Sequence, residues 1–84
     1  MRASITVKEL VEEYIAGKDM KESSRDFYRI TLRKHIVPHL GSMKAVAVTR
    51  VDVQRAHMKM SKTARYSANR AMALLSAAYV WGAK

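Results

Sequence analysis

A cluster of polar and basic side chains at residues 65–70 offers the clearest chemistry in the sequence. It consists of Arg65, Tyr66, Ser67, Asn69 and Arg70. Arginine neutralises phosphates and can pair with both O6 and N7 of guanine, and asparagine can pair in a similar way with adenine. A helix beginning at Ser67 would add unpaired backbone N–H groups, which bind phosphate. The cluster therefore indicates contact with a nucleic acid.

Each of these residues also has a simpler interpretation. Arg65, Ser67 and Arg70 could serve only to cap a helix and solvate its surface, although their clustering at one helix start favours nucleic acid. Asn69 could equally be a buried side chain that fixes a turn. The isolated lysines are expected to contribute general electrostatics rather than specific contacts: Lys34, Lys59 and Lys62.

The 84-residue chain carries a formal net charge of +9, and this charge is unevenly distributed. Residues 1–26 contain six acidic side chains and five Lys or Arg, whereas residues 27–84 contain eleven Lys or Arg and one acid, Asp52. A field of one sign this large is typical of proteins that bind a polyanion, most commonly nucleic acid. The alternative is a solvated surface on a fragment whose acidic half has been removed.

Length and composition limit the remaining classes of protein. The chain is long enough for one small domain with a single core. It contains no cysteine, which excludes disulfides and thiolate metal sites and suits a reducing cytoplasm. No apolar run reaches the roughly 20 residues that span a bilayer, and the N-terminus lacks the apolar region of a signal peptide. We therefore expect a soluble, cytoplasmic protein with no membrane partner.

Neither metal binding nor catalysis is expected. His35 and His39 are four residues apart, but Pro38 interrupts their helix, and no cysteine or nearby carboxylate completes a site. The serine, histidine and aspartate residues show no arrangement of nucleophile, base and orienting group. We expect no cofactor.

Helix-start signals and apolar periodicity predict an all-α fold, a small bundle of four helices. Residues 6–9 (TVKE) and 49–52 (TRVD) both have the form of a capping box, so helices should begin there. These two helices should end at Gly17 and near Ser61. Residues 43–48 form a short apolar connection, for which a strand would have no obvious partner.

The second helix should begin at Ser23 or Ser24 and end at about residues 35–37, because Pro38 disfavours helical geometry in the residue before it. Two faces of this helix compete for the core. Tyr28, Leu32 and Ile36 form the more consistently apolar face, so we assign them to the core. The other face should lie nearer the surface: Phe27, Thr31 and Lys34.

The fourth helix, expected from about Ser67 onwards, is apolar on nearly all sides beyond its basic start. Such a helix is usually buried all round. We therefore expect it to be the central helix on which the others pack, with its basic N-terminal end facing solvent.

Three features follow one another along the chain. The first is a helix with the pattern Y-x-x-x-L-x-x-x-I that ends in IVPHLG, and the second is an apolar link to a T-x-x-D helix start. The third is YSANR, which opens a small-residue-rich helix that ends in Trp. Their residues are Tyr28, Leu32, Ile36, Pro38, Gly41, Thr49, Asp52, Ser67, Asn69, Arg70 and Trp81. Together they resemble the SAM-like core-binding domain of phage-integrase-type tyrosine recombinases, from about Thr6 to Lys84.

The resemblance implies an N-terminal domain that closes one side of a C-shaped clamp around duplex DNA. In this family the helices equivalent to the second and fourth lie against the major groove. A catalytic domain that carries the tyrosine nucleophile normally follows, and other recombinase protomers assemble on the DNA. The present chain would be non-catalytic by itself.

The resemblance also implies two sets of DNA-contacting residues. The set on the second helix is Lys21, Ser23, Ser24, Phe27 and Thr31, and the set on the fourth is Arg65, Tyr66, Ser67, Asn69 and Arg70. Phe27 departs from the family pattern, because a phenyl ring can only stack or touch a thymine methyl group where a polar side chain would read a base or phosphate.

The sequence thus predicts a DNA-binding domain that assists integration or excision by a recombinase. The rival hypothesis is a helical protein-interaction module that docks through its last helix by Leu74, Val80 and Trp81. Polyanion binding must fall steeply with ionic strength, whereas apolar docking should barely change.

Overall fold

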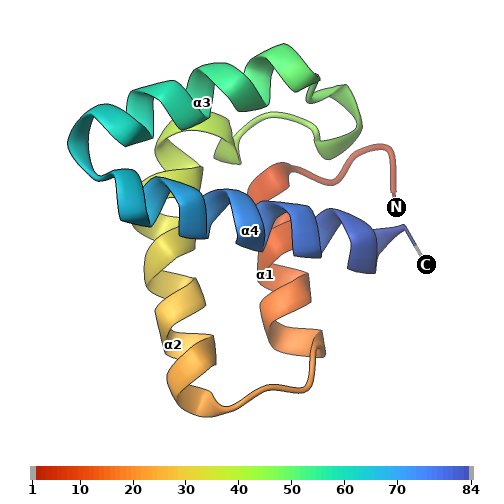
Figure 1. Cartoon of the computed structure of the whole chain (residues 1–84). Coiled ribbons are helices and arrows are strands. Elements are labelled where there is room, and N and C mark those ends of the chain that lie inside the picture. Colours follow the sequence, from red (N-terminus) through yellow and green to blue (C-terminus); the bar gives the residue numbers. More distant parts are fainter. Residues whose placement is uncertain (1, 84) are drawn as a thin grey trace.

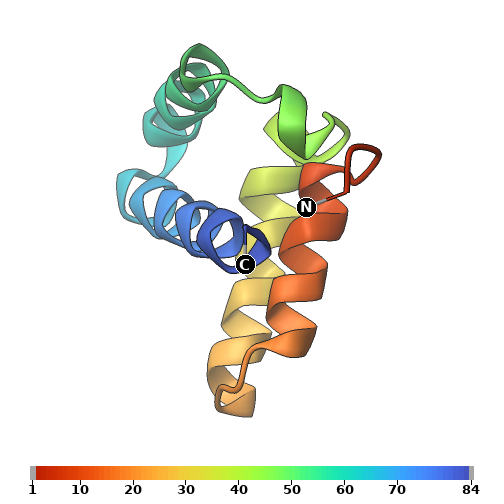
Figure 2. The same cartoon turned by 90° about the vertical axis from the view of Figure 1, so that its right-hand side faces the viewer.

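The computed structural model describes residues 2–83, which form two helical hairpins lying across each other (Figures 1 and 2). The first hairpin pairs α1 (Val7–Gly17) with α2 (Glu22–Thr31), and α2 continues without a break into η1 (Leu32–Gly41). A connection containing the short turn η2 (Ala45–Ala47) leads to α3 (Arg50–Thr63), which forms the second hairpin with α4 (Arg65–Gly82). The arrangement confirms the expected all-α bundle.

Capping boxes fix the starts of α1 and α3, as the sequence predicts. The Thr6 hydroxyl accepts from the Glu9 N–H at 3.2 Å, and the Glu9 carboxylate accepts from the Thr6 N–H at 2.9 Å. Thr49 and Asp52 repeat the arrangement at 3.2 and 3.0 Å. In both boxes the hydrogen bond from the threonine backbone, followed by that from its hydroxyl, holds the pKa of the carboxyl below its ordinary value.

The second helix begins at Glu22, earlier than the expected start at Ser23 or Ser24, and its N-cap Lys21 makes no side-chain capping bond. A tertiary anchor sets this start instead. The guanidinium of Arg25 donates to the carbonyls of Ile15, Lys18 and Met20 and pairs with Glu22. Because Arg25 ties the loop after α1 to the first turn of α2, serine capping is not needed there.

The expected end of this helix before Pro38 is wrong. The chain continues helically to Gly41, with Pro38 inside the wider turns of η1, whose backbone bonds span five residues rather than four. A wider turn moves the carbonyl that would clash with a proline ring in an α-helix. As a result Leu32, Ile36 and Leu40 form one continuous buried stripe.

Helix α4 lies across α1 and the α2–η1 helix and also contacts α3, which confirms its expected central place. Three of its five buried residues are alanines, which let neighbouring helices approach closely: Ala68, Ala71, Leu74, Leu75 and Ala78. The helix is not buried on all sides, however, because Val80 is 62% exposed. Trp81 is half-buried and packs edge-on against Tyr14, with ring centroids 6.0 Å apart.

The apolar connection before α3 finds its backbone partner in the segment that leads into α1. The Val7 N–H donates to the Met43 carbonyl at 2.9 Å, and the Ala45 N–H donates to the Ile5 carbonyl at 2.8 Å. The Tyr79 hydroxyl of α4 donates to the Ala45 carbonyl at 2.6 Å, and burial raises the pKa of Tyr79. These bonds hold the second hairpin against the first.

Candidate nucleic-acid interface

The first two turns of α4 present their polar side chains outward because one small residue fixes the rotation of the helix. Ala68 is fully buried, and positions 66 and 70, two residues away on either side, fall on the opposite face. Positions 65 and 69 flank that face and are exposed as well. This face carries Arg65, Tyr66, Asn69 and Arg70. Four of the five residues predicted at this helix start therefore share one solvent-facing surface.

The expected cap at Ser67 is wrong. Helix α4 begins at Arg65 with Ala64 as its N-cap, and the first helical bond runs from the Ala68 N–H to the Ala64 carbonyl at 2.9 Å. Burial of Ala68 requires its N–H to be paired, so the helix must already have formed there. Ser67 is half-buried beside it. Helix α3 extends to Thr63, two residues past its expected end near Ser61, so Ala64 alone separates it from α4.

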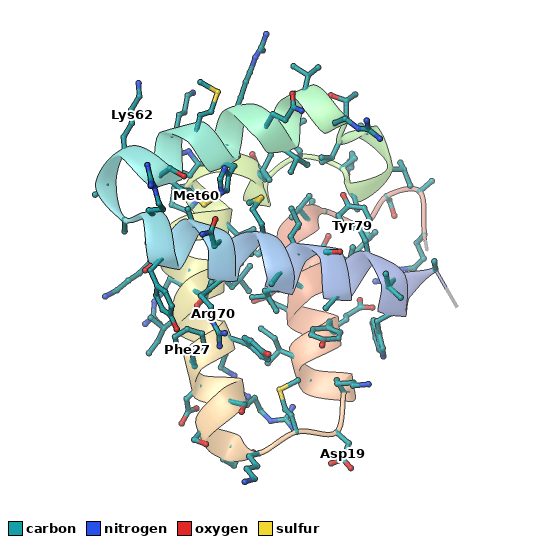
Figure 3. All side chains as sticks on the ribbon, viewed as in Figure 1. Asp19, Phe27, Met60, Lys62, Arg70 and Tyr79 are labelled. Atoms are coloured by element: carbon teal, nitrogen blue, oxygen red, sulfur yellow. The ribbon has the colours of Figure 1, made fainter. Side chains whose placement is uncertain are left out.

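The predicted contact residues of the second helix meet those of the fourth. The guanidinium carbon of Arg70 lies 5.2 Å from the centroid of the Phe27 ring and 5.9 Å from that of Tyr66. Figure 3 shows Phe27 and Arg70 together where α4 crosses α2. Ser23, Ser24 and Tyr28 line the same shallow recess as Phe27 and Arg70. We call the surface formed by Ser23, Ser24, Phe27, Arg65, Tyr66, Asn69 and Arg70 the α2–α4 face.

Both aromatic rings lie within the range of a cation–π attraction to Arg70. This attraction uses none of the five N–H donors of the guanidinium. Phe27 remains 39% exposed and Tyr66 72% exposed. The N–H groups of Arg70 therefore remain available to an anionic group, and both rings remain open to apolar contact.

Acidic side chains near the start of α2 are paired and do not offset the charge of this face. Glu22 pairs with Arg25 at 3.2 Å, and Asp26 pairs with Arg29 at 3.3 Å. Arg65 and Arg70 belong to none of the ion pairs found within residues 2–83. No carboxylate side chain follows Asp52 in the sequence. The α2–α4 face is therefore positively charged.

Other predicted contact residues lie elsewhere. The expectation that Thr31 lies near the surface is wrong: it is 4% exposed, and its hydroxyl donates to the Phe27 carbonyl at 3.0 Å. This bond within the helix satisfies the hydroxyl and permits its burial. Lys21 is exposed at the N-cap of α2, and Lys34 is exposed on η1. Lys62 is exposed near the end of α3 (Figure 3).

A histidine that the sequence reasoning did not assign to the interface joins Asn69. The Nε2 atom of His57, on α3, lies 2.9 Å from the Oδ1 atom of Asn69. Asn69 is exposed and is not the buried, turn-fixing side chain that was the alternative. One feature of the sequence could have indicated this contact. His57 shares a helix face with Ala56 and Met60, both of which turn toward the core.

The rival docking hypothesis requires Leu74, Val80 and Trp81 to form one exposed apolar surface, and they do not. Leu74 is 2% exposed, and Trp81 packs against Tyr14. Val80 alone of the three is largely exposed. Among residues 2–83 there is no group of three or more His, Cys, Asp or Glu side chains placed to hold a metal ion. Over the same residues, no helix has both the length and the hydropathy to cross a bilayer.

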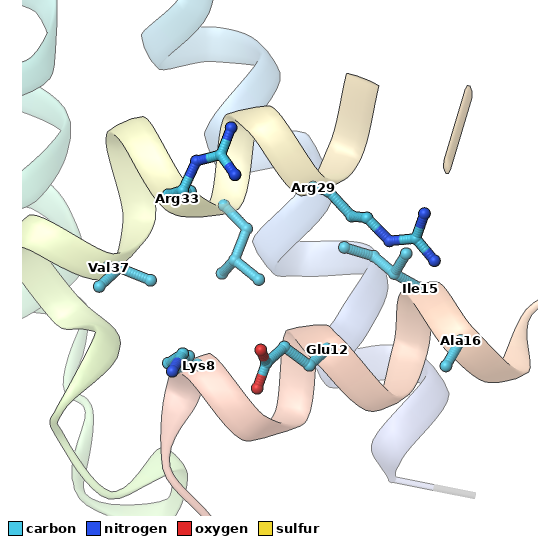
Figure 4. A pocket seen from close by; sticks show the side chains of 8 residues that line it. Lys8, Glu12, Ile15, Ala16, Arg29, Arg33 and Val37 are labelled. Atoms are coloured by element: carbon cyan, nitrogen blue, oxygen red, sulfur yellow. The ribbon is translucent and has the colours of Figure 1, made fainter. Parts of the chain in front are cut away.

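A second arginine pair lies away from the α2–α4 face. A groove of about 510 Å³ runs between α1 and the α2–η1 helix (Figure 4). Arg29, Arg33 and Lys8 stand around its apolar floor together with Glu12. No α4 residue is among those that line the groove. The groove therefore carries basic side chains at a site separate from the α2–α4 face.

Comparison with known proteins identifies one family. A family model described as "Phage integrase, N-terminal SAM-like domain" matches residues 6–61, which span α1 to most of α3. The match ends before α4, so the placement of the Arg65–Arg70 cluster rests on the structure. Searches of curated proteins and of solved structures return no match.

Proposed function

The chain belongs to the family of phage integrase N-terminal SAM-like domains, and on that premise we propose that it is the DNA-binding core-binding domain of a site-specific tyrosine recombinase. Its role is to hold duplex DNA during integration or excision, and it carries no catalytic chemistry of its own. A catalytic domain and further recombinase protomers are the proposed protein partners. Because its proposed substrate is chromosomal or phage DNA, the proposed location of the protein is the cytoplasm.

One observation carries the proposal: two sets of residues from separate helices converge on one positively charged face. The guanidinium of Arg70 on α4 lies over the Phe27 ring of α2, and both residues line one recess with Ser23 and Ser24. Arg65 and Arg70 have no ion-pair partner within the described residues 2–83, so their charge is available to phosphate. A helix pair that offers donors, cations and apolar rings together suits a DNA groove.

The side chains of this face divide the work of recognition. Arg65 and Arg70 neutralise phosphates, and Arg70 can also reach guanine O6 and N7. The exposed ring edge of Phe27 can touch a thymine methyl group. Ser23 and Ser24 can donate to phosphate oxygens. Most of the affinity should come from the cations, with little preference for sequence.

Amide chemical-shift mapping tests the proposal residue by residue. A generic duplex is titrated into the 15N-labelled domain at low salt. We expect shifts in residues 22–27 and 65–70, with little change in residues 8–16 of α1. Shifts centred on α1 and the groove beside it, or no shifts at all, would contradict the proposed interface.

A further inference from the structure

His57 and Asn69 form a hydrogen-bonded bridge between α3 and α4 at the edge of the α2–α4 face. The His57 Nε2 atom and the Asn69 Oδ1 atom are 2.9 Å apart. His57 is partly buried, whereas Asn69 is exposed and lies beside Arg70 on the outward face of α4. The bond to His57 favours one orientation of the Asn69 amide at the place where it would meet DNA.

The bridge determines which end of the Asn69 amide is free. Oδ1 is a hydrogen-bond acceptor, so the bond requires a proton on His57 Nε2. With Oδ1 turned toward α3, the two N–H groups of Nδ2 remain for an outside partner. Pairing with adenine needs both ends of the amide, because Oδ1 must accept from N6 while Nδ2 donates to N7. The bridge occupies one lone pair of Oδ1 and holds this atom toward α3, which disfavours the two-contact pairing.

We propose that His57 is a positioning residue that fixes Asn69 as a hydrogen-bond donor toward DNA and thereby disfavours adenine at this position. The partner is an acceptor oxygen or nitrogen of DNA, supplied either by a phosphate or by the O6 and N7 edge of guanine. The inference rests on the proposed DNA-binding function. It replaces the contact with adenine that the sequence alone suggests for Asn69.

The tautomer of His57 tests the positioning role without DNA. We would record the 15N resonances of the imidazole in the free domain at a pH where the ring is neutral. Protonation at Nε2, with slowed exchange of the ring N–H, is the expected result. Protonation at Nδ1 would overturn the proposal, since Nε2 would then accept from Nδ2 and leave Oδ1 facing outward.

Selection from a pool of randomised duplexes tests the effect on recognition. Four proteins are compared: wild type, His57→Phe, His57→Gln and Asn69→Ala. Phenylalanine cannot donate to Oδ1, so the amide is free to turn, and adenine should become about 5-fold or more enriched at the position read by Asn69. Glutamine can donate to Oδ1 in place of the imidazole, so His57→Gln should keep the wild-type profile.

The Asn69→Ala variant distinguishes the two acceptor sources. Loss of a guanine preference at one position identifies a base contact, whereas uniformly weaker binding to all sequences identifies a phosphate contact. Enrichment of adenine by the wild type at a position that depends on Asn69 would overturn the proposal, as would identical profiles for His57→Phe and wild type. If the wild type bound no duplex, the proposed function would fail, while the tautomer measurement would still decide the positioning role.

Discussion

Removing both arginines of the α4 start should weaken DNA binding and lower its salt dependence by a calculable amount. Each phosphate contact contributes about 0.9 to the slope of log affinity against log salt, so Arg65→Ala with Arg70→Ala should lower the slope by about 1.8. Between about 50 and about 200 mM salt, that difference corresponds to about a 12-fold change in affinity. The double variant should therefore bind more weakly at low salt and lose less affinity as salt rises.

A matched control separates position from net charge. Lys8→Ala with Arg33→Ala removes the same two charges from the formal net charge of +9, but does so at the groove beside α1 and leaves the Arg29–Asp26 ion pair in place. Fluorescence anisotropy with one labelled duplex measures both double variants, and circular dichroism checks that each remains helical. We expect the control to keep a slope close to that of the wild type. Equal losses of slope in the two variants would refute the α2–α4 face and indicate binding by overall charge.

Further predictions concern stability and are measured by urea or thermal unfolding. Arg25→Ala should lower the free energy of unfolding by about 1.5–3 kcal/mol, because a charged donor to three carbonyls is lost. Arg33→Ala is the control and should change the free energy of unfolding little. Equal effects of the two substitutions would contradict the anchor at the start of α2. Tyr79→Phe should cost about 1–3 kcal/mol by leaving a buried carbonyl unpaired. Burial raises the pKa of Tyr79 in the folded state. The contribution of Tyr79 to the free energy of unfolding is therefore fully present below pH of about 10 and is lost as pH rises further. The Tyr79→Phe variant should lack this loss. The folded-state pKa values of Glu9 and Asp52 are lowered, so the contribution of these carboxylates to stability is present above pH of about 4 and is lost as pH falls. Alanine at both N-cap threonines, Thr6 and Thr49, should make stability depend less on pH in this acidic range. An unchanged pH dependence would contradict the capping account.

The starts of α1 and α3 could be predicted from sequence because the signals are local. A capping box places both partners within four residues, so its hydrogen bonds form whatever the rest of the chain does. The structure places Thr6 and Thr49 at the N-caps expected for them. The face of the second helix chosen for the core was also largely correct, since Leu32 and Ile36 are buried.

The starts of α2 and α4 were misplaced because tertiary contacts decide them. Arg25 bonds to carbonyls up to ten residues away, and no local pattern reveals that reach. Burial of Ala68 sets the start of α4 in the same way, so Ser67 is left without a capping role. Pro38 misled for a different reason, because a wider helical turn accommodates a proline that an α-helix would not.

Contacts among the candidate interface residues could not be predicted from the sequence. Residue type and clustering indicated Arg65 and Arg70 as candidates, but the approach of Arg70 to Phe27 depends on the crossing of α2 and α4. Phe27, which departs from the family pattern, thereby gains a role in orienting a cation. The bond between His57 and Asn69 joins two helices and could not be read from either helix alone.

The salt dependence of duplex binding by the wild-type domain tests the central claim most directly. Fluorescence anisotropy with a generic labelled duplex is recorded at about 50 and about 200 mM salt, a range over which phosphate contacts weaken strongly. The proposed interface predicts measurable binding at the lower salt and a steep loss at the higher. An absence of binding at low salt, or an affinity that does not change with salt, would contradict a DNA-binding role for this domain.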